Sequence, residues 1–377
     1  MPGSRGAFAA VRIVALGARP LSVPLREPFV IATGRMDATC AALVTVVLED
    51  ETGRRAQGLG EAAALPPVTH EDQPDLLRGV AAARDVLEGE TLPDLPAAEA
   101  RLVGTLPEGP VARAGIASAL ADAWARLAEL PLHAFLGGAY GAPAALTTDI
   151  TLPIGAPEYV AGLARAYHDA GFDCFKVKVG RDHRADHAAL RAVAAAVPAA
   201  RFRLDANAGY TARDALELLV RLTADGLALE CFEQPCARDD LAGMAEVAAR
   251  SPVPVVADES FRGAEDLDRI TGARAAHGVN LKLAKLGGPA AAVALGREAR
   301  RRGLALMAGA MVETRVGIAT MAHVVAALGG VEWVDLDTAF LLARDPFAGG
   351  YRAEGPRLVL EPGAGSGVVL TQDGRMG

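Results

Sequence analysis

Apolar and polar positions follow one pattern before residue 146 and another after it. In residues 11–61, β-branched runs alternate with polar positions, as expected of half-buried strands, and the ETGR stretch at 51–54 supplies a hairpin turn. Residues 27–40 show little periodicity and contain proline and glycine, so we expect a loop there. This stretch therefore predicts an antiparallel meander that begins at residue 11.

Helices follow these strands. Apolar residues recur at three- and four-residue spacing over 71–102 and 111–130, which predicts helices in both segments. Strands followed by helices, without alternation, are typical of an α+β module. A Gly- and Pro-rich stretch at 135–144 then marks a boundary.

From residue 146 onward, short apolar runs alternate with helical segments, and we count eight strands and seven intervening helices. Continuous apolar runs are typical of parallel strands buried on both faces, and this number of units closes into a barrel. The last helix is replaced by a Gly- and Pro-rich tail. We therefore predict an α/β protein, a modified TIM barrel (β/α)7β over 143–342. The α+β capping domain over 1–142 would be completed by 343–377, which returns to it.

Composition narrows the class of protein. A net charge of −8 and the lack of a basic cluster with interleaved aromatics argue against nucleic acid as a partner. No apolar run approaches the roughly 20 residues that a membrane-spanning helix needs. The four cysteines show no CxxC pair or zinc spacing, which favours reduced structural thiols in a cytoplasmic protein. We expect a small-molecule enzyme that forms a homo-oligomer.

Three acids end successive predicted strands: Asp205, Glu233 and Asp258. One acid in such a position often caps the next helix, but three in consecutive units would repel one another unless a cation neutralises them. Carboxylates without histidine or cysteine suit Mg²⁺, with Mn²⁺ as a possible substitute, and do not suit zinc. The pattern predicts a metal site at the carboxyl ends of the strands.

Three lysines accompany these acids. Lys176 and Lys178 share a face of the second strand, and Lys282 ends the sixth, so Lys178 and Lys282 would lie on opposite sides of the metal strands. A lysine acts as a general base when its pKa falls to about 7–8, and the charge of Lys176 and of the metal would lower it. With one lysine on each face of a carbon, the proton can leave on one side and return on the other. This arrangement predicts inversion.

Further polar residues flank this set. Asn207 and Glu259 follow metal acids and would orient them, although each could equally lie in a solvated loop. Asp335 and Asp337 place two acids on one side of the eighth strand. Two carboxylates aimed at the site would favour a cationic group such as an ammonium, whereas a salt bridge or a helix cap is the structural alternative.

These residues resemble the enolase superfamily, and within it the muconate lactonizing enzyme subgroup. That subgroup has K-x-K on strand two, three metal acids on strands three to five and a lysine on strand six, and the match extends over nearly the whole chain. The segment from Asp335 is similar to the D-x-D of the dipeptide epimerases, whose acids hold the α-ammonium. The resemblance implies Mg²⁺-dependent epimerisation of L,L-dipeptides to L,D-dipeptides at the C-terminal residue. Lys178 and Lys282 would be the acid/base pair, and Lys176 would contact the substrate carboxylate.

The sequence indicates less about which substrate side chain the protein prefers. Ala-Glu-specific members carry an arginine in the N-terminal-domain loop, where this chain has Gly34 followed by Arg35. The acids Glu27, Asp37 and Glu61 near that loop leave hydrophobic or cationic dipeptides open. Ala-Glu is therefore a weak candidate.

Other functions fit parts of the pattern. On the same fold, the alternatives are o-succinylbenzoate synthase, N-succinylamino-acid racemase and a muconate-type cycloisomerase, whose substrates lack a free ammonium. A Schiff-base aldolase would use one barrel lysine and no metal. A barrel that only binds ligands would not need the intact set of acids and lysines.

Overall fold

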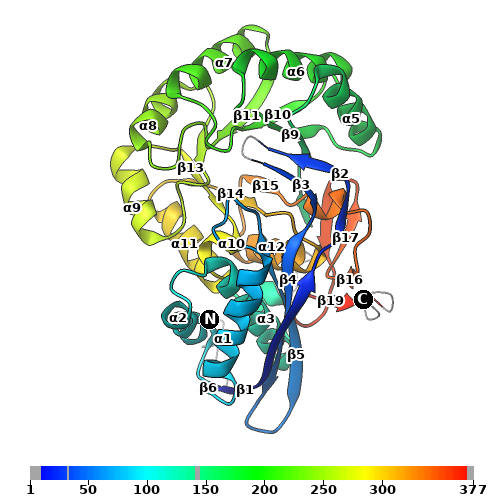
Figure 1. Cartoon of the computed structure of the whole chain (residues 1–377), viewed down its shortest axis with the longest axis vertical. Helices are drawn as coiled ribbons and strands as arrows, with labels where there is room; N and C mark the ends of the chain where they lie inside the picture. The colour runs from blue at the N-terminus through cyan, green and yellow to red at the C-terminus, as the bar shows by residue number, and fades with distance from the viewer. Residues whose placement is uncertain (1–9, 32–33, 141–144, 372–377) are drawn as a thin grey trace.

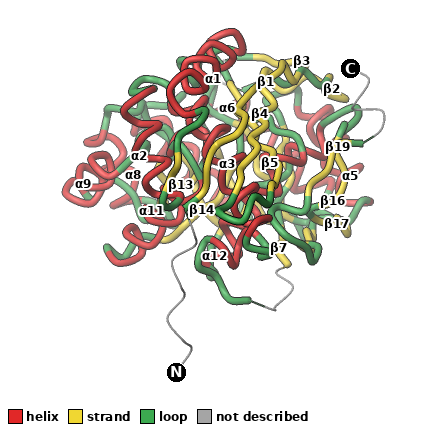
Figure 2. The backbone as a smooth tube through the Cα atoms, turned by 90° about the horizontal axis from the view of Figure 1, so that it is seen from below, coloured by secondary structure: helices red, strands yellow, loops and turns green. Residues whose placement is uncertain are grey.

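The computed structural model describes residues 10–31, 34–140 and 145–371. An antiparallel sheet of order β5-β4-β1-β6 forms the centre of the first module. Its strands are β1 (Val11–Leu21), β4 (Cys40–Glu49), β5 (Arg55–Ala64) and β6 (Thr91–Leu92). The helices packed against it are α1 (Gln73–Leu87), α2 (Leu95–Thr105) and α3 (Pro110–Leu127), followed by the short α4 (Leu132–Phe135) (Figure 2). The predicted α+β module and its first strand are confirmed.

Two local predictions in this module are wrong. The loop expected over 27–40 is largely strand in its described residues, because β2 (Pro24–Val30) and β3 (Arg35–Ala38) form an antiparallel pair, called here the hairpin, in which Phe29 pairs with Met36. A two-stranded ribbon buries little surface of its own, so it leaves a weak periodic signal. The helix expected over 71–102 is interrupted by β6, because Gly89 takes a positive φ of 90° after α1 and Pro93 follows the strand.

The second module is the predicted barrel (Figure 1). Eight parallel strands run in the order β15-β14-β13-β12-β11-β10-β9-β8. They are β8 (Ile150–Leu152), β9 (Cys174–Lys178), β10 (Arg201–Asp205), β11 (Ala228–Glu233), β12 (Val255–Ala257), β13 (Gly278–Leu281), β14 (Ala305–Gly309) and β15 (Trp333–Asp335). Strands β8 and β15, at the two ends of this order, are joined by three hydrogen bonds: Asp149 N to Val334 O, Leu336 N to Thr148 Oγ1 and Thr151 N to Asp337 Oδ2.

Helices occupy each of the seven crossovers. They are α5 (Pro157–Asp169), α6 (His183–Ala196), α7 (Ala212–Ala224), α8 (Leu241–Arg250), α9 (Ala264–Ala273), α10 (Leu283–Leu286) with α11 (Pro289–Arg301), and α12 (Arg315–Leu328). Helix α7 is capped by the Thr211 hydroxyl, which accepts a hydrogen bond from Asp214 N. In the described residues after β15, the only helical turn is the 3₁₀ turn η1 (Thr338–Leu341), which agrees with the predicted lack of an eighth helix.

The C-terminal segment contains strands β16 (Phe347–Gly349), β17 (Tyr351–Glu354), β18 (Arg357–Leu360) and β19 (Val368–Leu370). Strand β16 pairs with β19, and β17 pairs with β18, both antiparallel. Strand β18 also pairs with β7 (Ala145–Thr147), which precedes the barrel. The C-terminal segment also contacts the first module, where Asp122 on α3 accepts a hydrogen bond from Ser366 N. The predicted boundary at 142/143 lies outside the described residues, so the domain limits stay a prediction.

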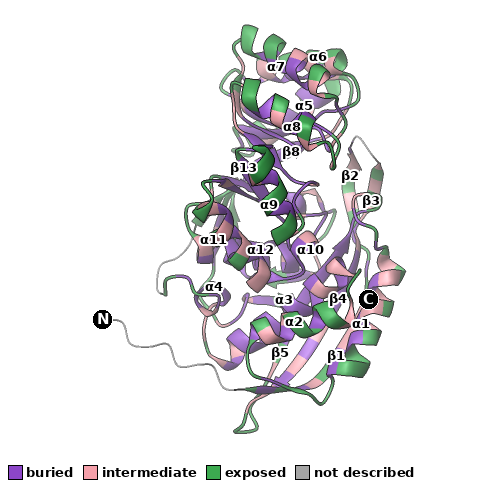
Figure 3. Cartoon of the chain, turned by 90° about the vertical axis from the view of Figure 1, so that its left-hand side faces the viewer, coloured by how far each residue is buried: buried purple, intermediate pink, exposed green. Residues whose placement is uncertain are grey.

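Helix α3 is buried on nearly all sides between the sheet and the barrel (Figure 3). It lies very close to β5, where a Cβ added at Gly58 or Gly60 would stand 2.1 or 2.0 Å from a backbone carbonyl oxygen of α3. Only glycine allows the strand and the helix to approach this closely. No helix in the described part of the chain is long and apolar enough to cross a membrane.

Candidate active site

The predicted residues converge at the carboxyl ends of the barrel strands. The three acids are at the ends of β10, β11 and β12, and the three lysines are on β9 and directly after β13. The two further acids are at the end of β15. All eight side chains are buried: Lys176, Lys178, Asp205, Glu233, Asp258, Lys282, Asp335 and Asp337. The parallel strands bring them together because each strand delivers its carboxyl end to the same rim.

Lys176 lies at the centre of this group. Its ammonium nitrogen is 2.9 Å from Asp205 Oδ2, 2.7 Å from Glu233 Oε2 and 2.7 Å from Asp335 Oδ2. Burial lowers the pKa of Lys176, but the attraction of Asp205, Asp335 and Glu233 outweighs it and holds the pKa well above the usual range. Lys176 therefore supplies a fixed positive charge between the metal acids and the acids of strand β15.

Lys178 and Lys282 approach the acids from the two sides. Lys178 Nζ is 2.7 Å from Asp205 Oδ2 and 3.2 Å from Asn207 Oδ1, whereas Lys282 Nζ is 2.9 Å from Asp258 Oδ2. Strands β10 to β12 separate the two lysine-bearing positions. Burial lowers the pKa of Lys282, yet the Asp258 and Glu233 carboxylates raise it overall. This direction is opposite to the one expected for a base, because the carboxylates stabilise the ammonium form.

Each of the three predicted metal acids has one oxygen held by a donor outside the predicted set of lysines and one oxygen facing a lysine of that set. Asp205 Oδ1 accepts from Asn207 N at 3.0 Å, and Glu233 Oε1 accepts from Asn280 Nδ2 at 2.7 Å. Asp258 Oδ1 accepts from Lys285. The second oxygens, Asp205 Oδ2, Glu233 Oε2 and Asp258 Oδ2, all contact ammonium groups. All three donors are carboxylate oxygens, the kind of ligand that Mg²⁺ prefers. The acids whose oxygens already lie within 4.8 Å of one another are instead Asp149, Asp335 and Asp337, so the metal role of Asp205, Glu233 and Asp258 stays a prediction.

The two predicted flanking residues also lie here. Asn207 has a positive φ of 42°, and this conformation lets its N–H hold Asp205 while its side chain reaches Lys178. Its amide also donates to Glu259 Oε1 at 3.1 Å. Burial, together with Asp258 and Asp205, raises the pKa of Glu259 to about 8. Asn207 therefore touches a predicted metal acid directly, and Glu259 is held through Asn207; their orienting roles stay a prediction.

The acids of strand β15 belong to a second carboxylate cluster. One oxygen from each of Asp149, Asp335 and Asp337 lies within 4.8 Å of the others. Asp337 Oδ2 accepts from Thr151 N at 2.5 Å, while Asp337 Oδ1 and Asp149 Oδ1 are buried without a hydrogen-bond donor among the described residues. Burial and the neighbouring Asp335 raise the pKa of Asp337 to about 7. This cluster has acceptor capacity left for a cationic group.

Sequence reasoning missed three residues that organise these clusters: Asn280, Lys285 and Asp149. Asn280 and Asp149 are polar residues in or beside buried strands, the same signal that identified the acids and lysines. Lys285 follows Lys282 by one short helical turn and donates to Asp258 Oδ1 and to the Asp258 carbonyl oxygen. Their spacing alone did not distinguish these residues from ordinary strand ends.

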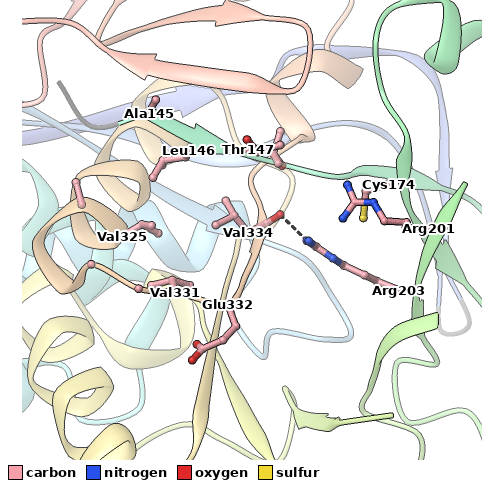
Figure 4. A pocket seen from close by; sticks show the side chains of 14 residues that line it. Ala145, Leu146, Thr147, Cys174, Arg201, Arg203, Val325, Val331, Glu332 and Val334 are labelled. Atoms are coloured by element: carbon pink, nitrogen blue, oxygen red, sulfur yellow. Dashed lines mark hydrogen bonds between the residues drawn. The ribbon is translucent and has the colours of Figure 1, made fainter. Parts of the chain in front are cut away.

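A cavity of about 570 Å³ lies at the opposite, N-terminal end of the barrel (Figure 4). Arg203 donates there to the Val334 carbonyl oxygen at 2.8 Å, to Asp149 at 2.9 Å and to Glu230 at 2.8 Å. Arg201 is also paired with Glu230. Since carboxylates already neutralise both arginines, this cavity is not an anion site, and the chemistry belongs at the other end of the barrel.

Fold and site together define a modified TIM-barrel enzyme with carboxylates and lysines at its strand ends. The family model described as "Enolase C-terminal domain-like" matches residues 158–374. The chain belongs to this family, and within it to the dipeptide epimerases of the enolase superfamily.

Three similar proteins support this assignment. An L-Ala-D/L-amino acid epimerase from Populus trichocarpa is 38% identical over 343 residues, which cover 89% of this chain and 80% of its own. An aromatic dipeptide epimerase from Herpetosiphon aurantiacus is 37% identical over 359 residues, covering 95% and 99%. The crystal structure of a dipeptide epimerase from Enterococcus faecalis V583, complexed with Mg and L-Leu-L-Tyr, has a TM-score of 0.85 at 32% identity and covers 95% and 99%.

Proposed function

We propose that this protein is a Mg²⁺-dependent dipeptide epimerase that converts L,L-dipeptides to L,D-dipeptides at the C-terminal residue. One observation carries this proposal. Lys178 and Lys282 reach the three-carboxylate group from its two sides, so a substrate held there would have one lysine on each face of its α-carbon. The similarity to proteins named dipeptide epimerases supports it.

Asp205, Glu233 and Asp258 would hold Mg²⁺ through the oxygens that now face lysines. Bound there, Mg²⁺ would stabilise the negative charge that develops on the substrate carboxylate when the α-proton leaves. Lys176, fixed as an ammonium by its three carboxylates, would add positive charge at the same place. Substitution by Mn²⁺ and assembly into a homo-oligomer stay predictions.

Lys178 and Lys282 would be the two groups that carry protons to and from the α-carbon. One lysine, as the neutral amine, takes the α-proton from its face of the carbon, and the other, as the ammonium, returns a proton to the opposite face. The configuration inverts, and the enzyme keeps its total number of protons while the two lysines exchange protonation states, which the reverse reaction restores. Asn207 holds Lys178 at 3.2 Å and would keep its nitrogen directed at the carbon.

Asp335 and Asp337 would bind the substrate α-ammonium. The donor-free Asp337 Oδ1 supports this role, because a buried carboxylate oxygen without a partner is unfavourable until a cation or donor fills the place. The rivals on this fold use substrates without an ammonium, and no observed contact favours them. A Schiff-base aldolase would leave the carboxylate group beside its lysines without a task.

Incubation of a dipeptide library and N-succinyl amino acids in D₂O with Mg²⁺, analysed by mass spectrometry, tests this function. We expect one deuterium at the C-terminal α-position of dipeptides and none in the succinylated compounds. Failure of every dipeptide to exchange would contradict the proposal, and exchange in the succinylated compounds alone would favour the rival function.

Single lysine variants test the two-base arrangement. Lys178→Ala and Lys282→Ala should each lower epimerisation about 10²–10⁴-fold, because each removes one of two required proton carriers. Each variant should still exchange deuterium into one epimer, and the two variants should act on opposite epimers. Equal exchange from both epimers in either variant would show that the lysine removed in that variant is not one of the two bases.

A further inference from the structure

The cavity that contains the lysines encloses only about 20 Å³, so a substrate would enter it by displacing the side chains that line it. These side chains form a polar and an apolar side. The polar side holds the proposed catalytic lysines and the Asp335–Asp337 pair. The apolar side, called here the apolar wall, consists of side chains from the hairpin, from the segment after β5 and from the segment after β14. These residues are Phe29, Ile31, Leu65, Val68, Met311 and Val312.

The apolar wall is fixed over the barrel by contacts of the hairpin. The Ile31 carbonyl oxygen accepts from Arg181 Nη2 at 2.9 Å, and the Val30 carbonyl oxygen accepts from Ile154 N at 3.3 Å. The Phe29 ring centroid is 5.7 Å from Lys178 Nζ. Because Lys178 is placed at the α-carbon in the proposed reaction, a side chain on that carbon would lie against Phe29 and its neighbours.

Of the charged groups on the hairpin, Glu27 is exposed and the other three have partners outside the wall. Arg35 pairs with Asp37 at 2.9 Å, and both side chains are more than 60% exposed. The Arg26 side chain donates to the Leu342 carbonyl oxygen at 2.8 Å. Glu61, on β5, accepts hydrogen bonds from Thr314 N and Oγ1. The described residues of the wall therefore offer no partner for a charged substrate side chain.

We propose that the apolar wall receives the side chain of the epimerised residue, so that the preferred substrates are dipeptides with an apolar C-terminal residue. This inference rests on the proposed epimerase function. A Glu or Lys side chain in this place would lose its hydration without gaining a partner, whereas Leu or Phe would bury apolar surface against apolar surface. The preference for an apolar side chain follows from the apolar residues beside Lys178. The proton transfer by the two lysines does not depend on this preference.

A panel of three dipeptides tests the side-chain preference separately from the epimerase function. L-Ala-L-Leu, L-Ala-L-Glu and L-Ala-L-Lys are incubated with the enzyme and Mg²⁺ in D₂O, and kcat/KM for exchange at the C-terminal α-position is measured. We expect L-Ala-L-Leu to exceed the other two at least about 100-fold. Comparable or faster exchange of the Glu or Lys dipeptide would overturn the apolar preference and leave the epimerase function standing. Exchange in none of the three, nor in the wider library, would overturn the function itself.

A variant of the wall gives a second test. In Phe29→Ala, the ratio of kcat/KM for L-Ala-L-Leu to that for L-Ala-L-Ala should fall about tenfold or more, because the smaller dipeptide makes fewer contacts with the lost ring. The ratio corrects for any loss of folded enzyme. Val86→Ala, on the exposed face of α1, is the matched control and should leave the ratio unchanged. An unchanged ratio in Phe29→Ala would contradict the placement of the side chain.

Discussion

At the scale of single residues, the site works by dividing each carboxylate between two tasks. One oxygen is held by a protein donor, and the other is turned toward positive charge. In Asp258 the holding donor is itself a cation: Lys285 holds its Oδ1 and its carbonyl oxygen, while Lys282 contacts its Oδ2 at 2.9 Å. Residues that fix the first oxygen determine where the second one points, so they should influence metal binding without touching the metal.

Lys285→Met tests this division. The variant keeps the length of the side chain but removes the donor to Asp258, so the Mg²⁺ dissociation constant measured by calorimetry should rise about 10–100-fold. Arg78→Met, an exposed cation on α1, is the control for the loss of one positive charge and should bind Mg²⁺ as the parent does. Equal affinity in both variants would show that Lys285 does not position Asp258.

At the scale of elements, the closest packing in the first module is between a strand and a helix. Strand β5 carries Gly58 and Gly60 on the face that meets α3, and α3 in turn packs on the short barrel helix α10. Close backbone approach at these two glycines thus links the capping sheet to the element that follows Lys282. A side chain at either position must push α3 away from the sheet.

Gly60→Ala should therefore lower the free energy of unfolding by about 1–3 kcal/mol or more, because its Cβ would stand 2.0 Å from the Gly115 carbonyl oxygen. Gly104→Ala on α2 is the matched control: a Cβ there meets nothing within 4 Å and should stabilise the helix by about 0.5–1 kcal/mol. Urea denaturation measures both. A Gly60→Ala midpoint equal to or above that of the parent would contradict the close packing.

At the scale of the whole molecule, carboxylates of the first module cap helices of the barrel. Glu61 on β5 accepts from Thr314 N and Gly317 N at the start of α12. Glu99 on α2 accepts from Ala290 N and Ala291 N at the start of α11. Each satisfies backbone donors that a helix start leaves free, so the two modules hold one another by the polar ends of helices as well as by apolar packing.

This arrangement predicts a pH dependence. Burial raises the pKa of Glu61 from 4.5 to about 7, so between these values the folded protein keeps a proton that the unfolded chain has lost. The contribution of Glu61 to the free energy of unfolding is then fully present below pH 4.5 and is lost as the pH rises through about 7. From pH 5 to 7.5, the parent should lose on the order of 1–3 kcal/mol more than Glu61→Gln.

Chemical denaturation at several pH values measures this difference. Glu51→Gln, in the exposed turn between β4 and β5, serves as the control and should follow the parent curve. Parallel curves for the parent and Glu61→Gln would mean that Glu61 does not carry this proton.

The barrel and its ring of charged residues were predictable because the signal repeats. A lysine or acid at the end of an apolar run is unfavourable to bury, and a second charged residue at the next strand end indicates that the two belong to one functional site. The hairpin carrying Phe29 was not predictable, because its two strands bury little surface and take their place from contacts with Arg181 and Ile154. Asn280 was overlooked because its task, holding Glu233, is visible only when two strands lie side by side.

The contact between the first and last barrel strands has a consequence for how specificity could diverge. Asp337 helps to join β15 to β8 through Thr151 N, and it is also the proposed receptor of the α-ammonium. A mutation of Asp337 that removes binding of the α-ammonium would therefore also remove a hydrogen bond between the first and last barrel strands. The apolar wall is free of this conflict, because its hairpin lies outside the barrel sheet. In proteins that evolve from this one, the preference for the substrate side chain should change readily, while recognition of the dipeptide α-ammonium is kept. Directed-evolution libraries should accordingly yield more folded variants at Phe29 than at Asp337.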